Sequence, residues 1–173
     1  MKTIDLTKIK IIATDIDGVL TDGHAIVDSN GNELKRISFR DLDAVGYGRK
    51  IGLDFILVTG EDNGFVDFFS ERFSIPCLYR GIKDKLSALN SICKQHNITI
   101  DEICYIGDSL RDSEAILNSG FGVAPSDAAK SARSSAAFIT ESKGGKGVLA
   151  EVVELFYEKM FNNGTGSMNA KQE

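Results

Sequence analysis

The stretch that decides the fold runs Ile9-Lys-Ile-Ile-Ala-Thr-Asp15-Ile-Asp17-Gly-Val-Leu-Thr21. It is an apolar run that ends in two aspartates spaced two apart and then a glycine, which predicts a β-strand delivering carboxylates into a turn. Side chains two apart on a strand point to the same side, so Asp15 and Asp17 can take different roles only where the strand ends and Gly18 bends the backbone.

Two carboxylates held this close repel each other unless a cation lies between them. A hard divalent cation with oxygen ligands is the natural neutraliser, so we expect Mg²⁺ here, with one carboxylate left to attack a phosphorus atom. The alternative is a strand followed by an ordinary Asx turn, in which Asp and Gly are common for local reasons.

Three later segments add reactive groups in a fixed order. A second apolar strand ends in the hydroxyl of Thr59, and an isolated cation, Lys85, starts a helical pattern. A third apolar strand leads to Asp108, with Asp112 four residues on. In open parallel sheets the ligand site lies at the carboxyl ends of the strands, so these groups and the two aspartates can converge there.

Apolar runs alternate with amphipathic stretches along the rest of the chain. This alternation predicts an α/β fold, a Rossmann-like open parallel sheet with helices on both faces. The expected strands are 9–14, 53–58, 103–106 and 120–123, with weaker ones at 76–79 and 136–139. The expected helices are about 43–51, 62–73, 84–96, 110–118 and 147–160.

Together the four segments closely resemble the motifs of the haloacid dehalogenase superfamily of phosphotransferases, in the same order and up to about Met160. The resemblance implies a phosphatase in which Asp15 forms an aspartyl phosphate and Asp17 serves as acid and base. It also implies that Asp15, Asp108 and the Asp17 carbonyl bind Mg²⁺, with Asp112 behind them. Thr59 and Lys85 would contact the phosphoryl group.

Each of these motifs also has a plain structural interpretation when taken singly. Thr59-Gly60 is compatible with a simple strand-to-helix turn, and Lys85 with a solvated helix residue. Asp112 is compatible with a first-turn carboxylate favoured by the helix dipole. The ordered set, rather than any one motif, favours the phosphatase site.

Between Asp22 and Phe39 two short β-like segments flank a turn rich in Asn, Asp and Gly, which indicates a hairpin flap at about 22–39. This insertion is too short for a cap domain, and the span from Thr59 to Lys85 holds no more than one helix and one strand. We therefore expect a capless phosphatase domain over 1–161 and a disordered tail over 162–173.

The composition excludes several classes of function. With 173 residues, a formal charge of −5 and a pI near 5.1, the chain is a single-domain length without the basic face that nucleic acid or an anionic membrane requires. It shows no membrane span or signal core, so we expect a cytoplasmic protein. The three cysteines predict reduced core thiols, and the two histidines predict surface imidazoles.

Within the superfamily the chain most resembles the small capless KDO 8-phosphate phosphatases of 2-keto-3-deoxy sugar acid biosynthesis and their nonulosonate 9-phosphate relatives. The resemblance implies a homotetramer whose hairpins assemble a small barrel, with a glycine-rich tail or a neighbouring subunit covering the site. The matching residues are Asp15-Ile-Asp-Gly-Val-Leu-Thr-Asp-Gly23, Asn30-Gly-Asn-Glu-Leu-Lys35, Arg40-Asp41, Val58-Thr-Gly60, Asp84-Lys-Leu86, Tyr105-Ile-Gly-Asp108 and Lys143-Gly-Gly-Lys-Gly-Val148.

Two departures bear on the substrate. Glu61 stands where the octulosonate enzymes tend to carry Arg, which resembles the sialic acid or KDN type, and Arg72 falls near a basic residue of those relatives. Leu42 and Asp43 replace a pattern that usually carries glycine, and they bear on the pocket's shape. The expected substrate contacts are Thr59, Gly60, Glu61, Arg72 and Lys146, although Glu61, Arg72 and Lys146 are also compatible with plain surface charges.

These observations predict a Mg²⁺-dependent phosphomonoesterase in lipopolysaccharide or surface carbohydrate biosynthesis. Its substrate is a KDO 8-phosphate or a nonulosonate (KDN) 9-phosphate, and the sequence leaves the two open. The alternative from another class is a non-catalytic or regulatory domain associated with a sugar-acid cytidylyltransferase. A phospho-switch needs no general acid at Asp17, which favours the enzyme.

Overall fold

The structure, a computed structural model, describes residues 4–76 and 79–162. Its centre is a five-stranded parallel sheet in the order β4 (Asp54–Leu57), β1 (Ile11–Thr14), β5 (Ile103–Ile106), β6 (Phe121–Ala124) and β7 (Phe138–Ile139). In β1, Thr14 lies opposite Leu57 on one side and Ile106 on the other. The residues that follow these three strands therefore start level with one another at one edge of the sheet.

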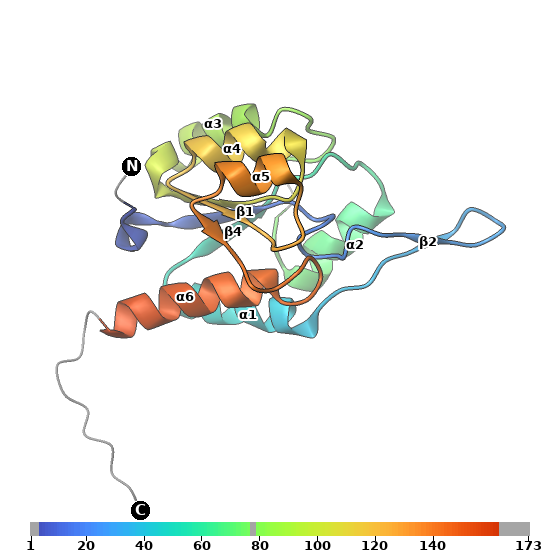
Figure 1. Cartoon of the computed structure of the whole chain (residues 1–173), viewed down its shortest axis with the longest axis horizontal. Helices are drawn as coiled ribbons and strands as arrows, with labels where there is room; N and C mark the ends of the chain where they lie inside the picture. Colours follow the sequence, from blue (N-terminus) through green and yellow to red (C-terminus); the bar gives the residue numbers. More distant parts are fainter. Residues whose placement is uncertain (1–3, 77–78, 163–173) are drawn as a thin grey trace, which may run out of the picture.

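Helices cover both faces of this sheet (Figure 1). The side chains of α1 and α6 join α2 in a large apolar cluster against one face, and those of α3, α4 and α5 join a second cluster against the other. The helices are α1 (Phe39–Lys50), α2 (Gly64–Phe73), α3 (Lys85–His96), α4 (Ser113–Asn118), α5 (Lys130–Ser135) and α6 (Val148–Asn162). Three 3-10 segments lie at Leu6–Lys8, Ile100–Glu102 and Leu110–Asp112.

The predicted α/β fold is confirmed, and its differences from expectation have local causes. Helix α1 starts at Phe39 rather than at 43, with Ser38 at the N-cap position. Phe39 was expected to end the second β-like segment of the hairpin, and it is the first residue of the helix instead. Helix α5 was not predicted, because its 6 residues are mostly polar and only Ala132 is buried. Of the weak strand at 76–79, Tyr79 forms an isolated bridge with Val58, while positions 77 and 78 lie outside the described residues.

The hairpin forms where expected and projects from the body of the molecule (Figure 1). It consists of β2 (Ile26–Val27) and β3 (Glu33–Leu34), which pair antiparallel. Asp28 closes the turn, because its carboxylate accepts from the amides of Asn30 and Asn32. The strands are only two residues long, so the hydrogen bonds between them contribute little to the stability of the hairpin.

Several smaller expectations can also be checked. Cys104 is buried and Cys93 is half-buried, both as free thiols, and Cys77 lies outside the described residues. His24 and His96 are exposed, as predicted. The predicted tail beyond 162 is not part of the described structure. In the described ranges, no helix combines the length and apolar character that crossing a bilayer requires.

Candidate active site

Asp15 lies directly after the central strand and faces a buried lysine. Its amide donates to the carbonyl of Ile106, which continues the ladder with β5 for one more residue. Lys85, 2% exposed, places its Nζ 3.1 Å from Asp15 Oδ2 and also donates to the carbonyl of Val58 at 2.6 Å. Because the second bond fixes the ammonium, Lys85 is an oriented cation rather than a solvated helix residue.

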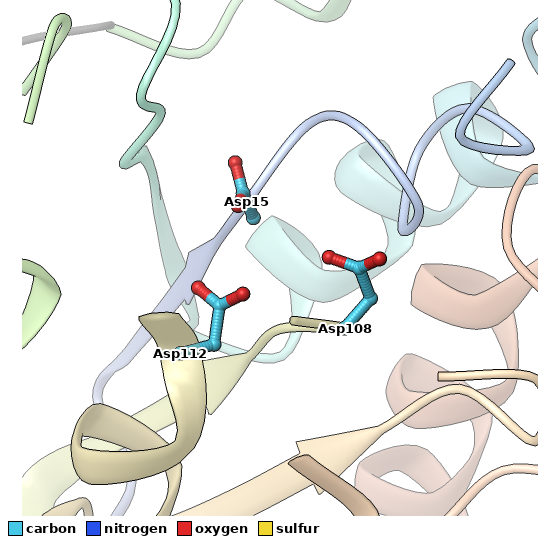
Figure 2. Close-up of side chains that lie close together, drawn as sticks. All are labelled: Asp15, Asp108 and Asp112. Atoms are coloured by element: carbon cyan, nitrogen blue, oxygen red, sulfur yellow. The ribbon is translucent and has the colours of Figure 1, made fainter. Parts of the chain in front are cut away.

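Three carboxylates converge beside this pair. Oxygens of Asp15, Asp108 and Asp112 lie within 4.8 Å of one another, and Figure 2 shows them projecting from separate segments toward a common space. Burial raises the pKa of Asp15 to about 7, with Lys85 lowering it and Asp112 raising it. Burial, followed by the charge of Asp112, raises the pKa of Asp108 to about 6.

This donor set fits a magnesium ion. Mg²⁺ prefers carboxylate, carbonyl and water oxygens, and the convergent carboxylates supply such ligands. The raised pKa values reflect negative charges held together in a poorly hydrated place, which a divalent cation between them would relieve. Asp15 and Asp108 could each offer an oxygen to such an ion, and their roles as metal ligands stay predictions.

Gly18 makes the close approach of the two loops possible. It adopts a φ of +79°, and a Cβ at this position would lie 2.1 Å from Asp108 Oδ2. A side chain here would therefore displace one of the expected metal ligands as well as strain the turn.

Asp112 lies behind the other carboxylates in a hydrogen-bond network. Its Oδ1 accepts from the buried Tyr105 hydroxyl at 2.6 Å, and its Oδ2 accepts from the amide and the hydroxyl of Ser109 at 2.9 and 2.5 Å. These bonds fix the carboxylate, which agrees with a supporting position. The contact between Tyr105 and Asp112 was not predicted, although a phenol in an otherwise apolar strand, two residues before Gly107, is a usable signal.

Asp17 diverges from Asp15, and its side chain is not part of the carboxylate group. Lys35 Nζ donates to both of its oxygens at 2.8 Å, and the Thr21 hydroxyl donates to Oδ1 at 3.1 Å. Lys35 follows β3 of the hairpin directly. Lys35 stands at the end of one of the family-matching segments, but its contact with Asp17 was not predicted because the two residues are 18 apart in sequence.

Thr59 and Gly60 follow β4 at the same edge of the sheet. Thr59 is 1% exposed, and its Oγ1 accepts from the amide of Glu61 at 3.1 Å. Because this bond uses the oxygen as an acceptor, the hydroxyl hydrogen can be donated to another oxygen, as a phosphoryl contact requires. Glu61 itself is exposed and accepts from the Asn63 side chain at 2.9 Å.

The other two predicted substrate contacts lie on different elements. The guanidinium of Arg72 stacks 5.8 Å from the centre of the Phe39 ring and lines a hollow of about 320 Å³ with Arg49. Lys146 is exposed and lines a hollow of about 460 Å³ with Arg40 and Glu151, among others. Within the described part of the chain, neither side chain contacts the carboxylate group, so their substrate roles stay predictions.

The glycine-rich segment before α6 approaches protein backbone. A Cβ at Gly144 would lie 2.3 Å from the carbonyl oxygen of Gly18, and the amide of Gly145 donates to the Val19 carbonyl at 2.9 Å. These glycines therefore support the turn that carries Asp17. Leu42, one of the two α1 residues that depart from the family pattern, packs against the larger apolar cluster.

Known proteins resemble this chain in sequence. A family described as haloacid dehalogenase-like hydrolase matches residues 61–152. The chain is 32% identical over 151 residues to the 3-deoxy-D-manno-octulosonate 8-phosphate phosphatase KdsC of Escherichia coli K12, across 85% of this chain and 78% of that protein.

Solved structures share the fold of this chain. The 3-deoxy-D-manno-octulosonate 8-phosphate phosphatase of Moraxella catarrhalis, in complex with magnesium, phosphate and KDO, superposes with a TM-score of 0.84 at 30% identity, covering 92% of this chain and 95% of that one. A cobalt-bound deoxy-D-mannose-octulosonate 8-phosphate phosphatase from Haemophilus influenzae gives 0.83 at 27% identity, covering 88% and 90%.

Proposed function

Since this chain belongs to the haloacid dehalogenase-like hydrolases, and among them to the capless KDO 8-phosphate phosphatase-like family, we propose that it hydrolyses the phosphate ester of a 2-keto-3-deoxy sugar acid with Mg²⁺ as cofactor. One observation carries the proposal. The carboxylate of Asp15 lies 3.1 Å from a buried ammonium and beside two further carboxylates at the carboxyl edge of the sheet.

The reaction that this geometry supports has two steps. In the first, an oxygen of Asp15 attacks the phosphorus, the bond to the sugar oxygen breaks, and Asp17 supplies the proton to the leaving alcohol. In the second, water attacks the same phosphorus, the bond to Asp15 breaks, and Asp17 accepts the proton of the water. The products are the sugar acid and inorganic phosphate.

The neighbouring residues stabilise the charge that moves through these steps. Lys85 neutralises both Asp15 and the phosphoryl oxygens, and the Thr59 hydroxyl donates to one of those oxygens. Asp15, Asp108 and the Asp17 carbonyl would hold the ion, with Asp112 fixed behind them. When bound, magnesium supplies the positive charge that lets an anionic ester approach this acidic edge.

The sugar is proposed as a class, and both chain lengths stay candidates. KDO itself is bound in the Moraxella catarrhalis relative, which supports an eight-carbon substrate. The sequence Thr59-Gly60-Glu61 supports a nine-carbon nonulosonate instead, because the octulosonate enzymes tend to carry Arg at the third position. Turnover of the two sugar phosphates by the purified chain decides between them.

We also propose that the enzyme works as a cytoplasmic homotetramer joined through its hairpins. Ile26, Val27 and Leu34 are 64%, 57% and 66% exposed. Apolar side chains gathered on a projecting hairpin favour burial against another surface. Light scattering of the purified protein tests the assembly.

The deciding experiment is turnover of p-nitrophenyl phosphate and of the sugar phosphates by wild type, Asp15→Asn and Asp54→Asn. An amide cannot form the acyl phosphate, so Asp15→Asn should lose at least about 10³-fold in kcat. Asp54→Asn, an exposed carboxylate at the other end of the neighbouring strand, serves as the matched control. Full activity of Asp15→Asn would contradict the assignment of Asp15 as the nucleophile. A wild type that is inactive with Mg²⁺ would favour the regulatory alternative.

A further inference from the structure

Lys35 makes a close contact with Asp17, the residue that we expect to act as acid and base. Its ammonium donates to both carboxylate oxygens of Asp17 at 2.8 Å, across 18 residues of sequence. The lysine side chain is only 9% exposed, although it leaves an exposed hairpin. Its Nζ also lies 5.1 Å from the centre of the Phe65 ring, on the first turn of α2.

These contacts distinguish the pair from an ordinary surface salt bridge. Exposed pairs contribute little because water competes for both charges and the side chains stay mobile. Here the ammonium is largely withdrawn from water, and the aromatic face adds a second favourable contact for the cation. The position of the Asp17 carboxylate is therefore set by Lys35 together with the Thr21 hydroxyl.

The direction of the hydrogen bonds indicates which half of the reaction benefits. An ammonium group only donates, so both oxygens of Asp17 act as acceptors in this arrangement. An accepting carboxylate is what a base needs when it removes a proton from water. To protonate a leaving alcohol, Asp17 has to give up at least one of these two bonds.

We propose that Lys35 is a positioning residue for the second step, a proposal that rests on the phosphatase function proposed above. It holds Asp17 as the proton acceptor while water attacks the aspartyl phosphate. In that step the new bond joins the water oxygen to phosphorus, and the bond from phosphorus to Asp15 breaks. The water proton goes to Asp17, which leaves Asp15 as a free carboxylate and releases inorganic phosphate.

The same contact couples the hairpin to the chemistry. Lys35 follows Leu34, the last residue of β3, so any displacement of the hairpin moves this ammonium. A surface that holds the hairpin in place thereby also holds Asp17.

The test compares the first turnover with the steady state for p-nitrophenyl phosphate, whose leaving group departs without a proton donor. Lys35→Met keeps the aliphatic stem over Phe65 and removes the donor. We expect its first turnover to stay within about threefold of wild type, followed by steady-state turnover about 10- to 100-fold slower. Because hydrolysis of the aspartyl phosphate has become limiting, a burst of about one p-nitrophenolate per active site should appear.

Two further variants make the result specific. Lys35→Arg should restore much of the steady-state rate, because a guanidinium can donate two bonds to one carboxylate. Arg36→Met, the same kind of change at the next and exposed position, should behave as wild type. Thermal unfolding of all three variants checks that the fold is kept.

Two outcomes would overturn the proposal. One is an equal loss of the first turnover and of the steady-state rate without a burst, which would place Lys35 in substrate binding or in folding. The other is wild-type kinetics for Lys35→Met. Failure of the proposed function is separately visible, because wild type itself would then release no p-nitrophenolate.

Discussion

The carboxyl edge of the sheet and the hairpin depart from the usual distribution of side chains in opposite directions. At the sheet edge, charged groups are buried, with Lys85 at 2% and Asp112 at 0% exposure. On the hairpin, apolar groups are exposed, with Leu34 at 66%. Neither arrangement is favoured in an isolated chain, since buried charges lose hydration and exposed apolar groups order water. We therefore propose that binding completes each of these two regions.

The two regions differ in what completes them. The edge groups follow the strands of a buried five-stranded sheet, and their charges favour binding of a cation and an anion. The hairpin has two-residue strands and an exposed apolar surface, which favours burial against another protein surface. Lys35 links the two regions, because it follows the last strand of the hairpin and its ammonium group contacts the Asp17 carboxylate.

The largest effect should come from removing the buried charge. Lys85→Met leaves Asp15 without its ammonium neighbour and the phosphoryl group without a cation, so we expect kcat for p-nitrophenyl phosphate to fall by about 10³-fold or more. Lys83→Met, an exposed lysine two residues earlier, is the control. Comparable losses of kcat in both variants would show that the buried, fixed position of Lys85 gives it no special role in turnover.

The next effect should come from the hairpin. A charge at Ile26, which lies opposite Leu34, opposes burial of this surface. We expect Ile26→Asp to convert the tetramer to smaller species in light scattering and to lower kcat/KM for the sugar phosphate by about 10²-fold. Ser29→Asp adds the same charge at the turn and should change neither quantity. A fully active monomer would contradict the proposed assembly.

Asp41 provides a buried charge on α1, outside the group formed by Asp15, Asp108 and Asp112. It is 0% exposed, its Oδ1 accepts from the Ala150 amide, and its Oδ2 has no hydrogen-bond partner in the described structure. Burial raises the pKa of Asp41 to about 6, so the folded chain holds this proton more tightly than the unfolded chain does. Its contribution to the free energy of unfolding therefore falls as pH rises from about 4 to 7.

Asn cannot ionise, so Asp41→Asn removes this dependence. Relative to Asp41→Asn, the free energy of unfolding of wild type should fall by on the order of 2 kcal/mol from pH 4 to pH 7.5, measured by urea unfolding. A difference independent of pH would show that Asp41 stays charged in the fold. In contrast to Lys85, this buried charge should act on stability and leave the kcat of the folded enzyme nearly unchanged.

The smallest effect should come from an exposed charge near the glycine-rich segment. If Lys146 contacts the sugar acid, Lys146→Ala should lower kcat/KM for the sugar phosphate by about tenfold. Turnover of p-nitrophenyl phosphate, which has no sugar, should change little. Equal effects on both substrates would make Lys146 a solvated surface residue.

Most of the edge could be predicted because its residues follow directly on apolar strands. Asp15, Thr59 and Asp108 come one or two residues after β1, β4 and β5, and the register of a parallel sheet brings such positions together. The contacts that fix Asp17 and Asp112 were harder to predict. Lys35 and Tyr105 make these contacts, which depend on the direction of their side chains and, for Lys35, on a partner 18 residues away in sequence.

The bond between Asp41 and Ala150 spans 109 residues, and this has a consequence for synthesis of the chain. The larger core includes Val148, Leu149 and Val152 of α6, so it cannot close until the last described helix has left the ribosome. Until then, a nascent chain exposes the apolar faces of α1 and of the central strands. Truncation within α6 should therefore yield an aggregating product rather than a smaller working enzyme.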